Sequence, residues 1–167
     1  MINTNIYQRL SIALFEPRIP QNTGNIARTC AAFKLPLHLI GPLGFKLDDK
    51  YLKRAGLDYW PFMNIKVHNN FQAFYDSLLM DTRIIGFSKR SQNKLDNVQF
   101  LNGDVLMFGR EDIGIPAEYK GKCSHIASIP MPGGVTDDSK SGVRSLNLAS
   151  ATAIAAYQAS LKLGLFQ

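Results

Sequence analysis

The chain has 167 residues, 46% hydrophobic and 19% charged, a length that suits one globular domain spanning residues 1–167. Its 19 Lys+Arg against 13 Asp+Glu give a net charge of +6, which favours polyanions such as nucleic acid but equally keeps a small protein in solution. The two cysteines lack the spacing of a metal site or disulfide framework, and no apolar run approaches the roughly 18 residues of a membrane span, so we expect a cytoplasmic protein with neither metal nor membrane contact.

Short apolar runs and helical repeats alternate along the chain. The runs predict strands at Leu10–Phe15, Leu37–Ile40, Ile65–Val67, Ile84–Phe87, Val105–Phe108 and Ile126–Ile129. Helical stripes lie between several of them, and the Ala-rich segment Leu146–Leu163 predicts the longest helix, ended by Gly164. This alternation predicts an α/β fold with a mostly parallel sheet sandwiched by helices.

Ligands of open α/β sheets bind beyond the carboxyl ends of the strands, so the segments that follow the strands are the candidates for function. Three of these segments are unusual in composition: residues 16–28, 108–116, and 130–131 with 144–148. The chain lacks GxGxxG, GxxxxGK[ST], HExxH and GxSxG motifs. Their absence argues against dehydrogenases, P-loop NTPases and the common hydrolases.

The first of these segments resembles the start of a helix. Asn22 or Thr23 can cap that helix, and Arg28 lies away from its apolar stripe. A guanidinium there can bind a phosphate or lie against a reacting hydroxyl, although a solvated surface arginine explains the spacing as well.

The other two segments allow similar pairs of interpretations. Gly109 and Pro116 indicate a rigid loop that carries Glu111, or a plain glycine turn with exposed charges. Ser145 is placed to cap the final helix with Asn147 in its first turn, or both face a bound group. Ile129 and Met131 can line a purine pocket or simply end a core strand.

Taken together and in order, the three segments resemble the signature motifs of the SPOUT superfamily, most closely its tRNA wobble-ribose 2′-O-methyltransferases. The motifs read P-x-N-T-G-N-I-x-R-T-C, L-M-F-G-x-E-x-x-G-I-P, and I-P-M followed by R-S-L-N-L. Residues 48–50 and 54–59 resemble the same subgroup. The match spans nearly the whole chain.

The resemblance implies a C-terminal deep trefoil knot, a homodimer, and S-adenosylmethionine as cofactor. The implied cofactor-binding residues are Phe87, Gly109, Ile129, Met131, Ser145 and Leu146. The implied residues of the transfer site are Asn22, Arg28, Glu111, Ser145 and Asn147. The run from Pro132 to Val143 is longer than the link usual in compact members, and it falls in the expected knot.

The implied reaction is methyl transfer to the ribose 2′-hydroxyl of the wobble nucleotide, cytidine or uridine 34, in the anticodon loop of tRNA. Phosphate-binding candidates are Lys34, Lys46, Lys50, Lys53, Arg54, Lys89, Arg90 and Lys94, and Tyr59 or Trp60 can stack a base or pack in the core. Two alternatives stay open: 2′-O-methylation of another tRNA or rRNA nucleotide, and a non-catalytic RNA-binding module.

Overall fold

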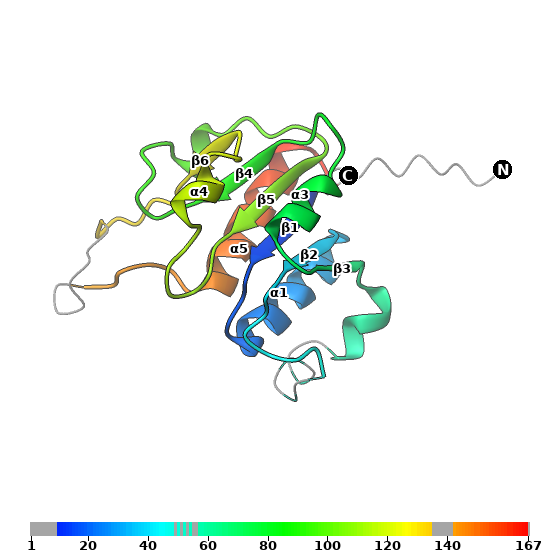
Figure 1. Cartoon of the computed structure of the whole chain (residues 1–167). Helices are drawn as coiled ribbons and strands as arrows, with labels where there is room; N and C mark the ends of the chain where they lie inside the picture. The colour runs from blue at the N-terminus through cyan, green and yellow to red at the C-terminus, as the bar shows by residue number, and fades with distance from the viewer. Residues whose placement is uncertain are drawn as a thin grey trace.

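A computed structural model describes residues 10–48, 50, 52, 54, 57–134 and 142–166. Its centre is a six-stranded sheet in the order β3-β2-β1-β5-β4-β6, in which every neighbouring pair of strands is parallel (Figure 1). The strands are β1 (Leu10–Phe15), β2 (Leu37–Ile40), β3 (Ile65–His68), β4 (Ile84–Phe87), β5 (Asp104–Phe108) and β6 (His125–Ala127). The parallel α/β sheet expected from the sequence is therefore confirmed.

The predicted strands agree with β1, β2 and β4 at both ends. β3 extends one residue further than predicted, to His68, and β5 begins one residue earlier, at Asp104. The last strand begins at His125 instead of Ile126. β6 ends at Ala127, so Ile129 lies beyond the strand instead of within it. Ser128 leaves the strand to donate its hydroxyl to Ser91 O at 2.8 Å, while its backbone N–H donates to Asn93 O. Beyond β6 the chain thus pairs through Ser128 with the segment at Asn93 and Lys94.

Two helices cover one face of the sheet. α1 (Pro20–Phe33) and α5 (Leu148–Lys162) share a hydrophobic cluster with the side chains of alternate strand residues such as Ile12 and Leu14. The small α5 residues Ala155 and Ala159 are fully buried there, so this helix lies close to the sheet. The low bulk of α5 follows from its Ala-rich sequence.

The short helices cover the opposite face. α3 (Phe71–Asp76) and α4 (Ala117–Lys120) lie in front of the sheet in Figure 1, with α5 behind it. Phe71 of α3 packs with Ala13 and Phe15 of β1, which alternate with the β1 residues of the first cluster. Both faces of β1 are thus buried, as its continuous apolar run predicts.

The final helix is shorter than predicted at its start. It runs from Leu148 to Lys162 instead of beginning at Leu146. At its end, Gly164 has φ of +66° and Leu165 N–H donates to Ser160 O at 2.9 Å, which is the C-terminal arrangement that glycine favours. The predicted role of Gly164 is confirmed.

Strands β1 and β5 are neighbours, but their connections leave the sheet in opposite directions. The chain passes from β1 through α1 to β2, and from β5 through α4 to β6 on the other side of β4. Such a divergence at the carboxyl ends leaves room for a ligand. The loops that begin at Glu16 and at Gly109 border this place.

The sequence predicts no membrane span and no metal site, and the family resemblance implies a C-terminal knot. Within the described residues, no helix is long and apolar enough to cross a membrane, and no three His, Cys, Asp or Glu side chains gather as metal ligands. The expected knot includes the link from Pro132 to Val143, of which residues 135–141 lie outside the described part. The knot stays a prediction.

Buried His38 of β2 contacts half-buried His68 of β3. His38 Nδ1 and His68 Nε2 are 2.9 Å apart, the rings stack at 5.2 Å, and Phe74 lies edge-on to both. Burial, then the charges of His68 and Lys66, lower the pKa of His38 to about 4. Burial followed by Lys66 lowers the pKa of His68 as well. The folded protein therefore favours the neutral form of both imidazoles.

We predict that stability falls as the pH drops below 6.5. Because the pKa of His38 is lower in the folded than in the unfolded chain, the unfolded state binds more protons between pH 6.5 and 4. The free energy of unfolding should be roughly 2 kcal/mol lower at pH 5 than at pH 7, as measured by urea denaturation. A His125→Gln variant, which removes an exposed imidazole, serves as the control; an unchanged free energy at pH 5 in the wild type would contradict the prediction.

Candidate active site

The carboxylate of Glu111 joins the loop after β5 to the start of α1. It accepts hydrogen bonds from the backbone N–H groups of Arg18 at 2.9 Å and Ile19 at 3.1 Å. A negative charge is favoured at a helix N-terminus, where the peptide dipoles leave partial positive charge. Glu111 thus fixes the beginning of α1 from another part of the chain.

Two asparagines extend this contact to the start of α5. Asn22, which is only 7% exposed, donates its amide Nδ2 to Glu111 Oε1 at 3.4 Å and accepts at Oδ1 from Asn147 Nδ2 at 3.0 Å. Asn147 also accepts at Oδ1 from the N–H groups of Ala149 and Ser150. Three segments far apart in sequence are therefore joined by the side chains of Asn147, Asn22 and Glu111.

The structure corrects both helix caps expected from the sequence. α1 starts at Pro20, so Asn22 and Thr23 lie in its first turn and do not cap it. Proline suits the first helical position because it lacks an N–H group. Asn147, and not Ser145, caps α5, since its side-chain oxygen reaches the free N–H groups from two residues nearer the helix.

The loop from Gly109 to Gly114 is a closed turn held by its own backbone. Arg110 and Gly114 exchange two hydrogen bonds, Arg110 N–H to Gly114 O at 3.2 Å and Gly114 N–H to Arg110 O at 2.9 Å. A Cβ at Gly109 would lie 2.0 Å from the carbonyl carbon of Gly114. Gly109 is required for a close approach, as expected, but that approach is to the loop itself.

Sequence reasoning missed an ionic network around this loop. Arg110 donates from Nε and Nη2 to both oxygens of Asp112 and from Nη1 to Glu16 Oε2 at 3.3 Å. The hydrogen bond from Arg110 lowers the pKa of Asp112 and raises that of Arg110 in turn. Glu16 belongs to the first motif segment. That it contacts Arg110 becomes visible only in the structure, where β1 and β5 are neighbouring strands.

Arg28 lies apart from the Asn147–Asn22–Glu111 contacts. Six residues separate it from Asn22, which puts the two side chains about 120° apart around α1. Arg28 is exposed, and its guanidinium lies 5.0 Å from the centre of the Tyr59 ring. Tyr59 is itself 37% exposed, so its interpretation as a core residue is wrong; the Trp60 side chain lies outside the described residues.

The expected cofactor residues lie at the carboxyl ends of the strands and before α5. Phe87 ends β4, stacks on the Phe108 ring at 4.6 Å, and packs with Ile129 against the main hydrophobic cluster. Phe87, Ile129, Met131 and Leu146 are half-buried, and Ser145 is exposed. Four of these residues thus present apolar surface, and Ser145 exposes a hydroxyl.

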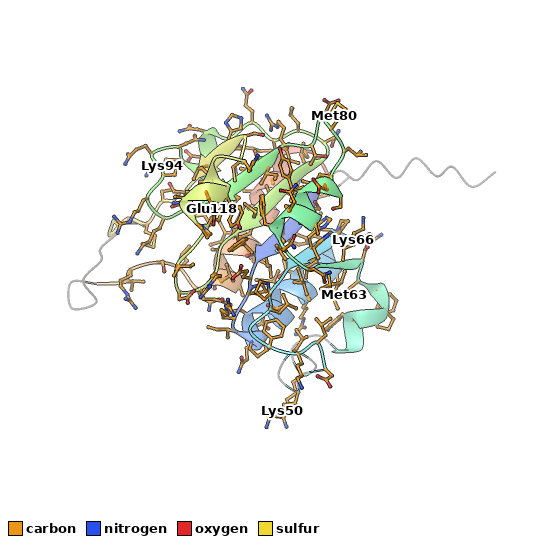
Figure 2. All side chains as sticks on the ribbon, in the orientation of Figure 1. Lys50, Met63, Lys66, Met80, Lys94 and Glu118 are labelled. Atoms are coloured by element: carbon orange, nitrogen blue, oxygen red, sulfur yellow. The ribbon has the colours of Figure 1, made fainter. Side chains whose placement is uncertain are left out.

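The expected phosphate-binding cations do not form one patch. Figure 2 shows Lys50 and Lys94 at well-separated ends of the molecule. Lys34, Lys46, Lys50, Arg54, Lys89 and Arg90 are exposed and Lys94 is half-buried, whereas the Lys53 side chain lies outside the described residues. A contact surface for RNA would use part of this set.

The family of the chain follows from its similarity to known proteins. The sequence profile of the SpoU rRNA methylase family matches residues 9–157, which include all three motif segments. The chain belongs to the SpoU methylase family. The family resemblance expected from the three motifs is therefore confirmed.

Relatives of high identity span the whole fold. A tRNA (cytidine(34)-2′-O)-methyltransferase of Aeromonas hydrophila is 42% identical over 93% of this chain and 95% of its own length. A solved structure from work on 2-OH methylation of C/U34 on tRNA is 46% identical, with a TM-score of 0.85 over 93% of this chain and 96% of that chain.

The fold also occurs in more distant members. The SpoU methyltransferase AviRb of Streptomyces viridochromogenes, solved in complex with AdoMet, shares 20% identity and a TM-score of 0.81 over 93% of this chain and 58% of that chain. At this identity the likeness establishes the common fold. The SpoU architecture thus persists while most residues change.

We predict that Glu111→Ala destabilises the fold. The substitution leaves two backbone N–H groups and the Asn22 amide without their acceptor, which should lower the free energy of unfolding by about 1–2 kcal/mol in urea denaturation. Glu118→Ala, which removes an exposed carboxylate on α4, should change it by less than about 0.5 kcal/mol. Equal losses in the two variants would contradict this role of Glu111.

Proposed function

We propose that this protein transfers a methyl group from S-adenosylmethionine to the ribose 2′-hydroxyl of the wobble nucleotide, cytidine or uridine 34, of tRNA. The observation that carries the proposal is the hydrogen-bonded set Asn147–Asn22–Glu111, which unites the motif segments of a SpoU methylase. The relatives at about 40% identity are named for this reaction at nucleotide 34, which supports the choice of substrate.

The residues at the strand ends fit S-adenosylmethionine. Half-buried Phe87, Ile129, Met131 and Leu146 offer apolar surface suited to an adenine ring, and exposed Ser145 offers a hydroxyl for a polar group. Gly109 keeps the loop beside them compact. When bound, S-adenosylmethionine supplies an activated methyl group on a sulfonium centre.

The protein residues orient the ribose and stabilise charge on its oxygen. A 2′-hydroxyl is a weak nucleophile, so it needs alignment and a group that favours loss of its proton. Arg28 keeps its positive charge at neutral pH and acts by stabilising the developing alkoxide or by holding a neighbouring phosphate. Ser145 and Asn147 orient the ribose, Asn22 holds Asn147 in place, and Glu111 holds the start of α1.

A loop nucleotide is the fitting substrate. Its ribose is accessible without opening a paired helix, which suits the anticodon loop. A second candidate is an rRNA nucleotide, which the description of the family favours. Both candidates use the same residues and differ only in the RNA that the surface accepts.

Methyl incorporation tests the proposal directly. The protein is incubated with tritiated S-adenosylmethionine and, separately, unmodified tRNA transcripts, cellular tRNA or rRNA. The modified ribose is located by its resistance to alkaline cleavage, because a methylated 2′-oxygen cannot attack the adjacent phosphate. Label at nucleotide 34 supports the proposal. Label elsewhere supports the second candidate, and RNA binding without label supports a binding module.

We predict that Arg28→Ala abolishes transfer while leaving cofactor binding intact. Arg28 lies on α1 and is not among the expected cofactor residues, so its loss should remove charge stabilisation and leave cofactor binding. Single-turnover transfer should fall by about a hundredfold or more, with the dissociation constant of S-adenosylmethionine changed by less than about twofold. Lys120→Ala on α4 is the matched control; near-normal transfer by Arg28→Ala would refute the assignment.

A homodimer is also part of the proposal. Ile154, Tyr157 and Leu161 follow each other at helical spacing on α5, and each is at least 42% exposed. Tyr157 continues into an aromatic cluster with Phe33 and Phe166. An apolar helical face of this kind marks a protein contact, and a second copy of the chain can cover it symmetrically.

We predict that Leu161→Glu dissociates the dimer. A charge at the C-terminal end of the α5 face loses hydration on association without gaining a partner. Sedimentation velocity should give a dimer for the wild type and a monomer for Leu161→Glu. Leu79→Glu, at an 83% exposed leucine remote in sequence from this helix, should remain dimeric. A monomeric wild type would remove the dimer from the proposal.

A further inference from the structure

The loops after β1 and β5 are joined by two carboxylates that point in opposite directions. Glu111 of the β5 loop accepts from the backbone at Arg18 and Ile19. Glu16 of the β1 loop accepts in return from Arg110 Nη1 at 3.3 Å. The first contact belongs to the candidate site described above. The second joins Glu16 and Arg110 outside that site.

Glu16 has an unusual backbone conformation at the end of β1. Its φ is +43°, in the left-handed region that non-glycine residues rarely adopt, and its N–H donates to Ile40 O at 2.8 Å. Its Oε2 atom accepts from Arg18 Nη2 at 3.0 Å as well as from Arg110. One carboxylate oxygen therefore serves an arginine from each of the two loops. Strain of this kind concentrates at functional sites.

Arg110 is fixed on every side. Asp112 takes its Nε and Nη2, Glu16 takes its Nη1, and its backbone pairs with Gly114. Because Arg110 immediately precedes Glu111 in the chain, a fixed Arg110 defines the point from which the Glu111 side chain projects. Its planar guanidinium makes both contacts at once, which a lysine cannot do.

Arg18 is fixed on the other loop. A Cβ at Gly44 would lie 2.7 Å from both Cα and Cδ of Arg18, so the loop after β2 packs directly against it. The N–H of Gly44 also donates to Pro17 O at 2.9 Å. The backbone N–H of Arg18 thus has a defined direction towards Glu111.

We propose that Glu16 and Arg110 are positioning residues for methyl transfer: their ion pair sets the separation of the β1 and β5 loops so that Glu111, Asn22 and Asn147 meet. Neither residue needs to touch the RNA or the cofactor. The inference rests on the proposed function. It extends that function by assigning the geometry of the transfer site to an ionic contact outside it.

The test compares rates with affinities in Glu16→Gln and Arg110→Lys. The single-turnover rate of methyl transfer to the substrate RNA, at saturating RNA and S-adenosylmethionine, should fall by about tenfold or more. Small displacements of a reacting group are costly to the rate. Dissociation constants for both ligands should stay within about twofold. The double variant should be about as slow as the slower single variant, since both substitutions break one contact.

The matched control is Arg83→Met at the other end of β5. It breaks the ion pair between Arg83 and Asp104, whose atoms are 2.7 Å apart at the start of that strand. It should lower Tm and leave transfer within about twofold, measured where the variant is folded. This control separates loss of a stabilising ion pair from loss of alignment.

Amide hydrogen exchange provides a readout that does not depend on activity. The N–H groups of Arg18 and Ile19 should exchange faster in Glu16→Gln than in the wild type, and at the wild-type rate in Arg83→Met. Wild-type transfer by Glu16→Gln, or a loss no greater than that of Arg83→Met, would overturn the inference and leave the proposed function standing. Methylation at another nucleotide would overturn the wobble assignment alone, with the positioning test carried out on that RNA. A chain that methylates no RNA would overturn both.

Discussion

The parallel pairing of β1 with β5 is the constraint on which the rest of the site depends. Leu14 and Phe108 are in register at the ends of these strands, and beyond them the chain turns away in opposite directions. Two loops therefore begin side by side and diverge. Long carboxylate and guanidinium side chains can bridge such loops, whereas small apolar ones cannot, which explains why Glu16, Arg110 and Glu111 gather at this edge of the sheet.

Much of the fold can be predicted from the sequence, because strands that are buried on both faces have continuous apolar runs. β1, β2 and β4 agree with the predicted residues at both ends. The starts of α1 and α5 could not be predicted from the sequence, because local cap preferences compete with contacts made elsewhere in the chain. Glu111 at the start of α1, and the amide of Asn147 reaching Asn22, are tertiary contacts that spacing along the chain cannot express.

The candidate site was predicted in part. Asn22, Glu111 and Asn147 come from three motifs and do meet. Arg28 instead contacts Tyr59, and the Glu16–Arg110 ion pair had no signal beyond the charges themselves. Motifs identify the residues that are typical of a family. The side of the helix on which each residue lies decides which of them act together. On α1, Asn22 and Arg28 serve two directions, one towards α5 and one towards the protein surface.

The two hydrogen-bonding ends of Asn147 limit which residues evolution can place there. Its oxygen caps α5 and its nitrogen donates to Asn22. Asp, Ser and Thr are good caps, yet an aspartate would turn the donor into an acceptor, and the shorter hydroxyls would have to choose one partner. Fewer residue types are therefore acceptable at this position than helix-capping preferences alone would allow. A change of Asn147 should be accompanied by a change of Asn22.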